Sequence, residues 1–482
     1  MTRPLVSSAK AGAQFLKAAR TTIRGCSIAV LFAVPLTALA QSSGPRSLEE
    51  LKQETVRRAE RNIVPLTGIK ADDAREAMAS LHSLDSDDWV AAWSRIGERY
   101  YARGDYFHAW DIFNVARWPS ERLSPAKQKA YARALDAFQA YAKSLTPPIE
   151  TVHIPFEGRE IVAYLRIPRA SGPVPLVFGI NGLDSRKEEV IARADRYLSA
   201  GVGVFAIDMP GTGQAPILID VGAERMFSAA LDYLATRRDV DAKRIVVQGR
   251  SWSGYWAAVL AYTEKDRIRG AVVHGVGIHE YFSPQWQKKA LSSREYLFDL
   301  YAARATVYGT KTMDEFLAYG PRLSLVARGL IDKPSAPMLL VNGERDTQQP
   351  IADLYLLMKH GDPKEVWVNP EGGHMGRSER WPQGKVLAEV VEPWVLQRLG
   401  VQATLLAQAN ADKDPANADK EQAAPKAPPR KPAPRVTLKP QGGSGSNVGD
   451  DAAGGGARSA EPSKGGNAGT PSGSFTGAAP KP

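Results

Sequence analysis

From about residue 147 onward, short apolar runs alternate with helical stretches, and this alternation constrains the fold more than any other feature. Strands that crossover helices cover on both faces have this composition. Two extended segments, Glu150–Pro155 and Ile161–Ile167, come first, and a Glu157-Gly158 turn would join them as a hairpin. The pattern predicts an α/β domain with a mostly parallel, doubly wound sheet and an antiparallel N-terminal hairpin. The later runs are Leu176–Ile180, Val202–Ile207, Ile245–Val247, Ala271–Val276, Met338–Val341 and Val366–Val368.

Residues 46–146, which precede this domain, have helical rather than extended periodicity. One apolar stripe at helical spacing is preceded by Ser86, an expected N-cap. Ser124-Pro125 predicts the start of a second helix, with a capping hydroxyl before a proline at the first helical position. No repeat of tetratricopeptide length follows, so we expect a non-repetitive helical region whose aromatic residues pack helix on helix. The stripe consists of Trp89, Trp93, Ile96 and Tyr100.

The α/β domain is expected to span residues 147–403 and to contain one long insertion. Residues 277–337 are far more than a strand-to-helix connection needs. Helical pieces are expected within them at Glu295–Ala303 and Met313–Leu317. We therefore predict a lid-like or pocket-lining segment.

The formal charge of +10 is concentrated at the two ends of the chain. Residues 1–40 contain five basic residues and no acidic one, and residues 411–482 contain 10 Lys and Arg against 7 Asp and Glu. The remaining body carries only +2. This is too little for the basic face that binds a phosphate backbone, so a nucleic-acid partner is not expected.

Residues 1–40 have the order of a secretory signal peptide. A basic stretch reaches Arg24, an apolar run covers Ile28–Leu39, and Ala38-Leu39-Ala40 is a small-x-small cleavage site. The run is shorter than the ~20 residues that span a bilayer, so no permanent membrane span is expected; an uncleaved anchor is the alternative. Cleavage after Ala40 predicts a periplasmic or secreted protein. It would also remove Cys26, the only cysteine, and with it any disulfide or thiolate site.

Residues 404–482 are predicted to be a disordered tail. The last 72 residues contain 12 Gly and 11 Pro and very few large apolar side chains. Such a segment buries too little surface to offset the entropy of ordering. Contact of the tail with the cell envelope is the alternative to simple disorder.

A candidate nucleophile follows the run Ile245–Val247. Gly249-Arg250-Ser251-Trp252-Ser253, followed by a helical stretch, has the small-x-Ser-x-small pattern of a nucleophile elbow. This sharp turn strains the serine backbone and raises its hydroxyl above the sheet. Ser253 stands where glycine is usual but is still small. A frame centred on Ser253 would put Tyr255 at a crowded position, so Ser251 is the predicted nucleophile.

Serine needs an adjacent base that is itself oriented by an acid. The elbow fold places them in the chain order Ser, acid, His. Asp346 follows Met338–Val341 and lies 95 residues beyond Ser251, and His374 lies 28 residues further on, after two glycines. Glu344 is the competing acid. The spacing predicts a triad of Ser251, Asp346 and His374.

Two backbone N–H groups are expected to bind the oxyanion of the reaction. One belongs to Trp252, and the other to Leu183 in the turn Asn181–Ser185, which follows the run Leu176–Ile180. We also expect an ion-pair brace behind this turn, with separately solvated charges as the alternative. Its members would be Asp184, Lys187 and Arg250.

The six other histidines are expected to have packing or surface roles. For His274 and His279, which flank the strand after the elbow, reach to the mouth of the pocket is the alternative. No His-x-x-x-His or His/carboxylate spacing indicates a metal site. The glycines in 208–213 lack the Lys-Ser/Thr of a phosphate loop. Neither a metal site nor a phosphate loop is therefore expected.

Roughly residues 85–400 resemble the FrsA-like esterase branch of the α/β-hydrolases, which is related to 2,6-dihydroxypseudooxynicotine hydrolase. The resemblance rests on Asn-Gly-Leu-Asp-Ser-Arg-Lys-Glu-Glu at 181–189, Asp-x-Pro-Gly-x-Gly at 208–213, Gly-Arg-Ser at 249–251 and the helical region before the domain. It implies an α/β-hydrolase fold with an N-terminal helical cap, a Ser-Asp-His triad, no cofactor and often a homodimer. The triad maps onto Ser251, Asp346 and His374.

The sequence therefore predicts an exported serine hydrolase that cleaves a small ester or related acyl compound. Three alternatives stay open: a C–C bond hydrolase of β-diketone or polyketide-like substrates, a peptidase or acyl-peptide hydrolase, and a non-catalytic envelope protein.

Overall fold

A computed structural model describes residues 46–360 and 364–401. The predicted signal peptide and the predicted tail lie outside these residues. All described residues belong to one compact unit, and the boundary expected near residue 147 stays a prediction. In the described ranges, no helix has the length and apolar character needed to cross a membrane.

The core is an eight-stranded sheet in the order β1-β2-β4-β3-β5-β6-β7-β8. β1 and β2 form the predicted antiparallel hairpin, β2 pairs antiparallel with β4, and all other pairs are parallel. The predicted α/β class and strand runs are thus confirmed. The strands are β1 (Glu150–Phe156), β2 (Arg159–Arg166), β3 (Val174–Ile180), β4 (Gly203–Ile207), β5 (Val240–Arg250), β6 (Gly270–His274), β7 (Met338–Gly343) and β8 (Lys364–Asn369).

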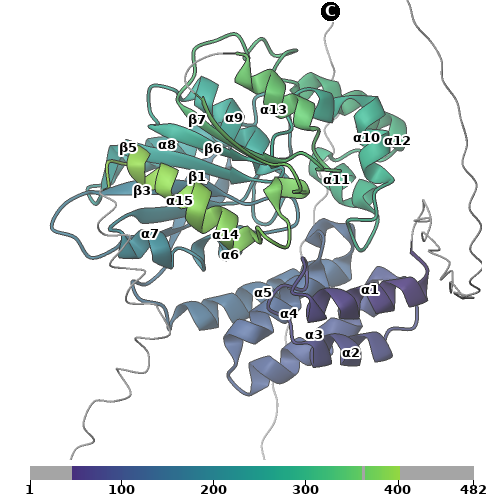
Figure 1. Ribbon diagram of the computed structural model, residues 1–482. Coiled ribbons are helices and arrows are strands. Elements are labelled where there is room, and N and C mark those ends of the chain that lie inside the picture. Colours follow the sequence, from purple (N-terminus) through teal and green to yellow (C-terminus); the bar gives the residue numbers. More distant parts are fainter. Residues whose placement is uncertain (1–45, 361–363, 402–482) are drawn as a thin grey trace, which may run out of the picture. The chain divides into compact units, whose positions relative to one another are not determined.

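Helices cover both faces of the sheet (Figure 1). On one face, the Phe178 ring of β3 lies 6.2 Å from that of Phe227 in α8. On the other, Gly179 lies against Val190 of α6 and Gly270 against Trp394 of α15. The strands are therefore buried from both sides. Outside the insertion that follows β6, the helices after β3 are α6 (Lys187–Ile191), α7 (Asp195–Ser199), α8 (Arg225–Thr236), α9 (Ser253–Thr263), α13 (Ile351–Met358), η4 (His374–Gly376), α14 (Gln383–Val386), η5 (Leu387–Val391) and α15 (Glu392–Arg398).

The region before the sheet is helical, as predicted, and Trp89 and Trp93 are buried in it. Ser124 caps α5 by accepting the Lys127 N–H at 3.2 Å. The expected cap at Ser86 is wrong: the Asp85 carboxylate caps α3 by accepting the Asp87 N–H at 2.8 Å, which makes Ser86 the first helical residue. The elements are α1 (Leu48–Glu60), α2 (Ala71–Ala79), α3 (Ser86–Ala102), α4 (Tyr106–Arg117), η1 (Glu121–Leu123) and α5 (Pro125–Ala142).

The insertion after β6 packs on the N-terminal helices. Arg58 donates to the Glu295 carbonyl at 2.6 Å, and the Phe298 ring lies 4.8 Å from that of Trp89. The expected helix Glu295–Ala303 is therefore wrong in its first part, because side chains of the other region bind this backbone; α11 starts only after the Asp299 cap. The elements here are η2 (Glu280–Phe282), α10 (Pro284–Leu291), α11 (Leu300–Tyr308), α12 (Met313–Tyr319) and η3 (Gly320–Leu323).

Candidate active site

Ser251 lies in a sharp turn between β5 and α9. Its φ of 56° is a left-handed conformation that non-glycine residues rarely adopt, and its N–H donates to the His274 carbonyl at 2.7 Å. A Cβ on Gly249 would lie 2.0 Å from the Ser253 carbonyl oxygen. Strand and helix therefore approach so closely that only glycine fits at 249, which explains the small-residue pattern of the elbow.

Ser253 has a structural role in the same turn. Its buried hydroxyl accepts the Arg250 N–H at 2.7 Å and donates to the Ile180 carbonyl at 2.9 Å. The hydroxyl ties the elbow to the neighbouring strand β3. Ser253 thus stands where glycine is usual, and its hydroxyl forms hydrogen bonds with the backbone. These bonds occupy the hydroxyl, so it is not positioned as a nucleophile.

The three predicted triad side chains come together at the carboxyl ends of β5, β7 and β8. Ser251 Oγ lies 2.7 Å from His374 Nε2, and His374 Nδ1 lies 2.9 Å from Asp346 Oδ2. Glu344, the competing acid, is exposed and accepts the Tyr355 hydroxyl at 2.7 Å. The geometry therefore brings Asp346, and not Glu344, to the histidine.

The Asp346 carboxylate is held in its charged form. Oδ1 accepts the N–H groups of Gln348 and Gln349 at 2.7 and 3.0 Å, which leaves Oδ2 for His374. Burial alone would raise the pKa of Asp346, but the His374 charge and these hydrogen bonds outweigh it and lower the pKa. The carboxylate therefore keeps its charge across neutral pH.

The loop that carries His374 is fixed by three side chains, of which the sequence brought only His274 near the site and assigned it no role there. His274 Nε2 donates to the Met375 carbonyl at 2.9 Å. Asn342 Oδ1 accepts the Met375 N–H at 3.1 Å, and Asn369 Nδ2 donates to the Gly376 carbonyl at 2.8 Å. Burial lowers the pKa of His274 to about 3, so this ring is neutral. His274 and Asn342 join strand ends to a loop distant in sequence, so no local pattern marks their roles. Asn369 ends β8 and bonds the loop that directly follows it.

The two expected oxyanion donors have no acceptor. Neither the Trp252 N–H nor the Leu183 N–H makes a hydrogen bond within the described ranges. The Gly182 carbonyl accepts Asn181 Nδ2 at 2.8 Å, and the Leu183 N–H of the same planar trans peptide points the opposite way. The turn also lies against the nucleophile, since a Cβ on Gly182 would be 3.3 Å from Ser251 Cβ.

The expected brace among Asp184, Lys187 and Arg250 is wrong. Lys187 pairs instead with Asp208 at 3.0 Å and with Glu188 at 2.8 Å. Asp184 Oδ2 accepts the Trp118 indole N–H at 3.3 Å. Asp208, at the end of β4, displaces Asp184 as the partner of the lysine, and Asp184 turns toward the helical region.

The turn is instead held by the last residue of α4 and by the segment that follows this helix. Arg117 donates to the Asp184 carbonyl at 2.8 Å. Arg186 forms a buried ion pair with Glu121 and donates to the Leu183 carbonyl at 3.1 Å. The second Glu121 oxygen accepts the Gly213 N–H at 2.8 Å. The helical region therefore fixes the backbone that presents the Leu183 N–H.

Replacing Glu121 with glutamine is expected to lower the free energy of unfolding by about 3–5 kcal/mol, because it leaves the Arg186 charge buried and uncompensated. Burial raises the pKa of Glu121, but Arg186 and Arg117 outweigh it and lower the pKa. The decrease in the free energy of unfolding should have its full size at any pH above the ordinary pKa of a glutamate. It should shrink as the pH falls through the lowered folded-state value. Urea unfolding at several pH values measures both.

The matched control is Glu98→Gln. Glu98 pairs with Arg133 at 2.6 Å, but the two side chains are 51% and 32% exposed. Such a pair contributes at most about 1 kcal/mol. Equal losses in the two variants would contradict a special contribution of the buried pair.

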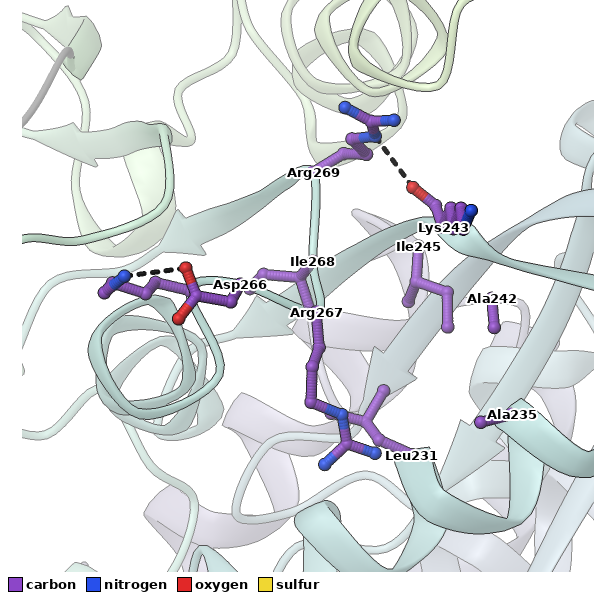
Figure 2. Close-up of a pocket in the computed structure, with 10 residues that line it drawn as sticks. Leu231, Ala235, Ala242, Lys243, Ile245, Asp266, Arg267, Ile268 and Arg269 are labelled. Carbon is purple, nitrogen blue, oxygen red and sulfur yellow. Dashed lines mark hydrogen bonds and ion pairs between the residues drawn. The ribbon is translucent and has the colours of Figure 1, made fainter.

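The hollow drawn in Figure 2 is not this site. It has a volume of about 520 Å³ and lies where β5 and β6 begin, beside Ile245 and Ile268. Arg269 Nε donates to the Lys243 carbonyl at 2.7 Å across it (Figure 2). The triad lies at the opposite, carboxyl ends of the strands. Within the described ranges, His, Cys, Asp and Glu side chains form no group of three suited to a metal ion.

Comparison with known proteins places this chain in a family. The family model for esterase FrsA-like proteins matches residues 91–370, more than half of the chain. Esterase FrsA of Vibrio vulnificus (strain YJ016) is 26% identical over 286 residues, 56% of this chain and 67% of that protein. Esterase FrsA of Vibrio parahaemolyticus is 23% identical over 316 residues, 61% of this chain and 74% of that protein.

Two solved structures share the fold. Wild-type AbyA5 is 22% identical with a TM-score of 0.62, covering 76% of this chain and 98% of its own. The 2,6-dihydroxy-pseudo-oxynicotine hydrolase is 22% identical with a TM-score of 0.55, covering 69% and 93%. The predicted family and fold are thus confirmed: the chain belongs to the esterase FrsA-like family and is a serine hydrolase of the α/β-hydrolase fold.

Proposed function

We propose that the protein hydrolyses a small carboxylic ester or related acyl compound through Ser251, His374 and Asp346. The observation that carries this proposal is the continuous hydrogen-bond chain from Ser251 Oγ through the imidazole to the buried Asp346 carboxylate. The family's printed name, an esterase, supports the choice of bond.

In the first half-reaction, Ser251 Oγ attacks the ester carbonyl carbon while His374 Nε2 takes the hydroxyl proton. Asp346 holds the Nδ1–H tautomer and stabilises the imidazolium that forms. The carbonyl π electrons move to oxygen, and the N–H groups of Trp252 and Leu183 bind the oxyanion. The tetrahedral intermediate collapses, the C–O bond to the alcohol breaks, and His374 returns its proton to the leaving oxygen.

In the second half-reaction, water attacks the acyl-enzyme carbonyl and gives a proton to His374. Collapse of the second tetrahedral intermediate breaks the bond to Ser251 Oγ and releases the acid. The proton returns to the serine, so the enzyme is regenerated and no cofactor enters the cycle. Arg117 and Glu121 of the helical region support the turn that contains Leu183, the first through the Asp184 carbonyl and the second through Arg186, which donates to the Leu183 carbonyl.

Fluorophosphonate labelling tests the nucleophile, and a substrate panel tests the bond. We expect one covalent adduct, on the peptide that contains Ser251, and turnover of short p-nitrophenyl esters. A matched β-diketone and a peptide p-nitroanilide complete the panel. Faster turnover of the diketone or the anilide would replace the ester assignment by C–C bond or peptide hydrolysis. Absence of both labelling and turnover would overturn the catalytic proposal and favour a non-catalytic protein.

A further inference from the structure

Gln349, which follows the acid of the triad, bonds both this acid and the residue that carries the nucleophile. Its backbone N–H donates to Asp346 Oδ1 at 3.0 Å. Its side-chain Nε2 donates to the Ser251 carbonyl at 3.1 Å, across 98 positions of the chain. The residue is only 2% exposed, so water does not compete for these bonds. One buried glutamine therefore contacts both ends of the proposed triad.

Two glycines after β6 leave room for the Gln349 carboxamide. A Cβ on Gly275 would lie 2.5 Å from Gln349 Oε1, and a Cβ on Gly277 would lie 3.2 Å from Nε2. Gly275 also has a φ of 95°, in the left-handed region that favours glycine. A side chain at residue 275 would push the carboxamide away from Ser251. The contact between Gln349 and the Ser251 carbonyl therefore depends on a glycine here.

The group opposite the carboxamide fixes its orientation. A carbonyl oxygen can only accept a hydrogen bond, so the NH₂ group of Gln349, and not Oε1, faces the Ser251 carbonyl. Gln349 Oε1 is then buried with no hydrogen-bond partner in the described part of the chain. An unpaired buried acceptor destabilises the fold, and an apolar side chain of similar size would avoid this loss. Stability alone therefore does not explain why a glutamine stands at this position.

The Ser251 carbonyl belongs to the same peptide as the Trp252 N–H. The cis peptide bonds of the described residues lie elsewhere, so this peptide is trans, and its C=O and N–H point in opposite directions. The carbonyl accepts the Gly254 N–H at 3.0 Å as well as Gln349 Nε2. Two hydrogen bonds to the carbonyl restrain the direction of the N–H on the other side, and they also polarise it. Gln349 therefore acts on an expected oxyanion donor.

The other expected oxyanion donor has the same arrangement. Asn181 Nδ2 donates to the Gly182 carbonyl at 2.8 Å. This carbonyl lies on the far side of the peptide that carries the Leu183 N–H. Each of the two peptides thus has a side-chain amide on its carbonyl, one from the loop after β3 and one from the loop after β7. Two separate loops supply the same contact to the two peptides that are expected to bind the oxyanion.

We propose that Gln349 is a positioning residue that orients and polarises the Trp252 N–H for the oxyanion. Without the carboxamide, the Ser251 carbonyl keeps its bond to Gly254 and loses the second one. The N–H is then less well directed when negative charge develops on the substrate oxygen, so the loss falls on the transition state rather than on substrate binding. This inference rests on the proposed hydrolytic function and adds a residue to its machinery.

Gln349→Met removes the donor and nearly keeps the size of the side chain. We expect kcat for p-nitrophenyl acetate to fall about tenfold with little change in KM, which is less than the roughly 10²–10³-fold loss when an oxyanion donor is deleted. The urea midpoint of unfolding should stay the same or rise, because the unpaired Oε1 is removed as well. Gln349→Leu also lacks a donor and provides a second variant.

A thiono ester separates an effect on the oxyanion from an effect on the serine or the histidine. Sulfur is a weak hydrogen-bond acceptor, so the kcat/KM ratio of p-nitrophenyl acetate to its C=S analogue reports N–H bonding at this atom. We expect both Gln349 variants to lower this ratio about fivefold or more. Gln248→Met is the matched control, since this half-buried glutamine of β5 accepts the Tyr197 hydroxyl at 2.9 Å. The control should leave the ratio unchanged.

Failure of this inference is distinguishable from failure of the hydrolytic proposal. If both Gln349 variants keep the wild-type ratio and kcat, the glutamine does not serve the oxyanion. An equal loss for the oxygen and sulfur esters would also overturn the inference, because it would place the effect on the nucleophile or the acid. In both cases fluorophosphonate labelling of Ser251 persists. If the serine is not labelled and no ester is cleaved, the hydrolytic proposal itself fails.

Discussion

Replacing Ser251 with alanine is expected to lower kcat/KM for the best ester by about a millionfold, the loss found when a triad nucleophile is removed. The change deletes the one oxygen that lies 2.7 Å from His374 Nε2. Alanine can keep the same backbone at φ 56°, so the fold should survive. Steady-state kinetics, together with loss of fluorophosphonate labelling, measures the effect.

Ser199→Ala is the control, because Ser199 is exposed and its hydroxyl donates only to the Asp195 carbonyl, at 2.7 Å. It should change kcat/KM less than about twofold. If Ser251→Ala kept more than about a hundredth of the activity, the nucleophile would be another group. The adduct would then have to be mapped to another residue, with Ser253 the first to check.

Much of the sheet follows from sequence because each strand carries its own local signal. Runs such as Leu176–Ile180 and Met338–Val341 are apolar throughout, since helices cover both faces, and they reappear as β3 and β7. The triad positions follow for a related reason. Parallel strands bring their carboxyl ends to one edge, so residues just after β5, β7 and β8 meet there despite their separation along the chain.

The side chains that support the site could not be predicted in this way. The Glu121–Arg186 pair joins residues 65 positions apart, and the His274–Met375 bond joins residues 101 positions apart. Neither pair has a characteristic spacing in the sequence, and no adjacent motif indicates the contact. The expected brace was wrong because several carboxylates compete for Lys187. The fold brings Asp208 to 3.0 Å from its ammonium, and the sequence does not show this proximity.

The helix errors have a similar origin. Asp85 and Ser86 are both good capping residues, and only the backbone geometry selects the carboxylate. Residues 295–299 have helical propensity, yet Arg58 binds the Glu295 carbonyl from another part of the chain. Tertiary hydrogen bonds therefore override a local preference of a few tenths of a kcal/mol per residue.

Asp346→Asn is expected to lower kcat by about ten-thousandfold with little change in KM, the effect of giving the histidine the wrong tautomer. The carboxylate accepts from His374 Nδ1 at 2.9 Å while two backbone N–H groups hold its other oxygen. Those N–H groups will keep the amide oxygen, so the amide NH₂ faces Nδ1. An N–H on Nδ1 would then face another donor, so the imidazole changes to the tautomer with its proton on Nε2. In that tautomer Nε2 cannot accept the proton of the serine hydroxyl.

Glu344→Gln provides the matched comparison, because it changes the same atoms two residues away in an exposed carboxylate that accepts only the Tyr355 hydroxyl. It should leave kcat within about twofold of the wild type. A large loss in Glu344→Gln with a small one in Asp346→Asn would reassign the acid. Equal small losses would mean that His374 needs no orienting carboxylate, and the proposed triad would reduce to a serine–histidine pair.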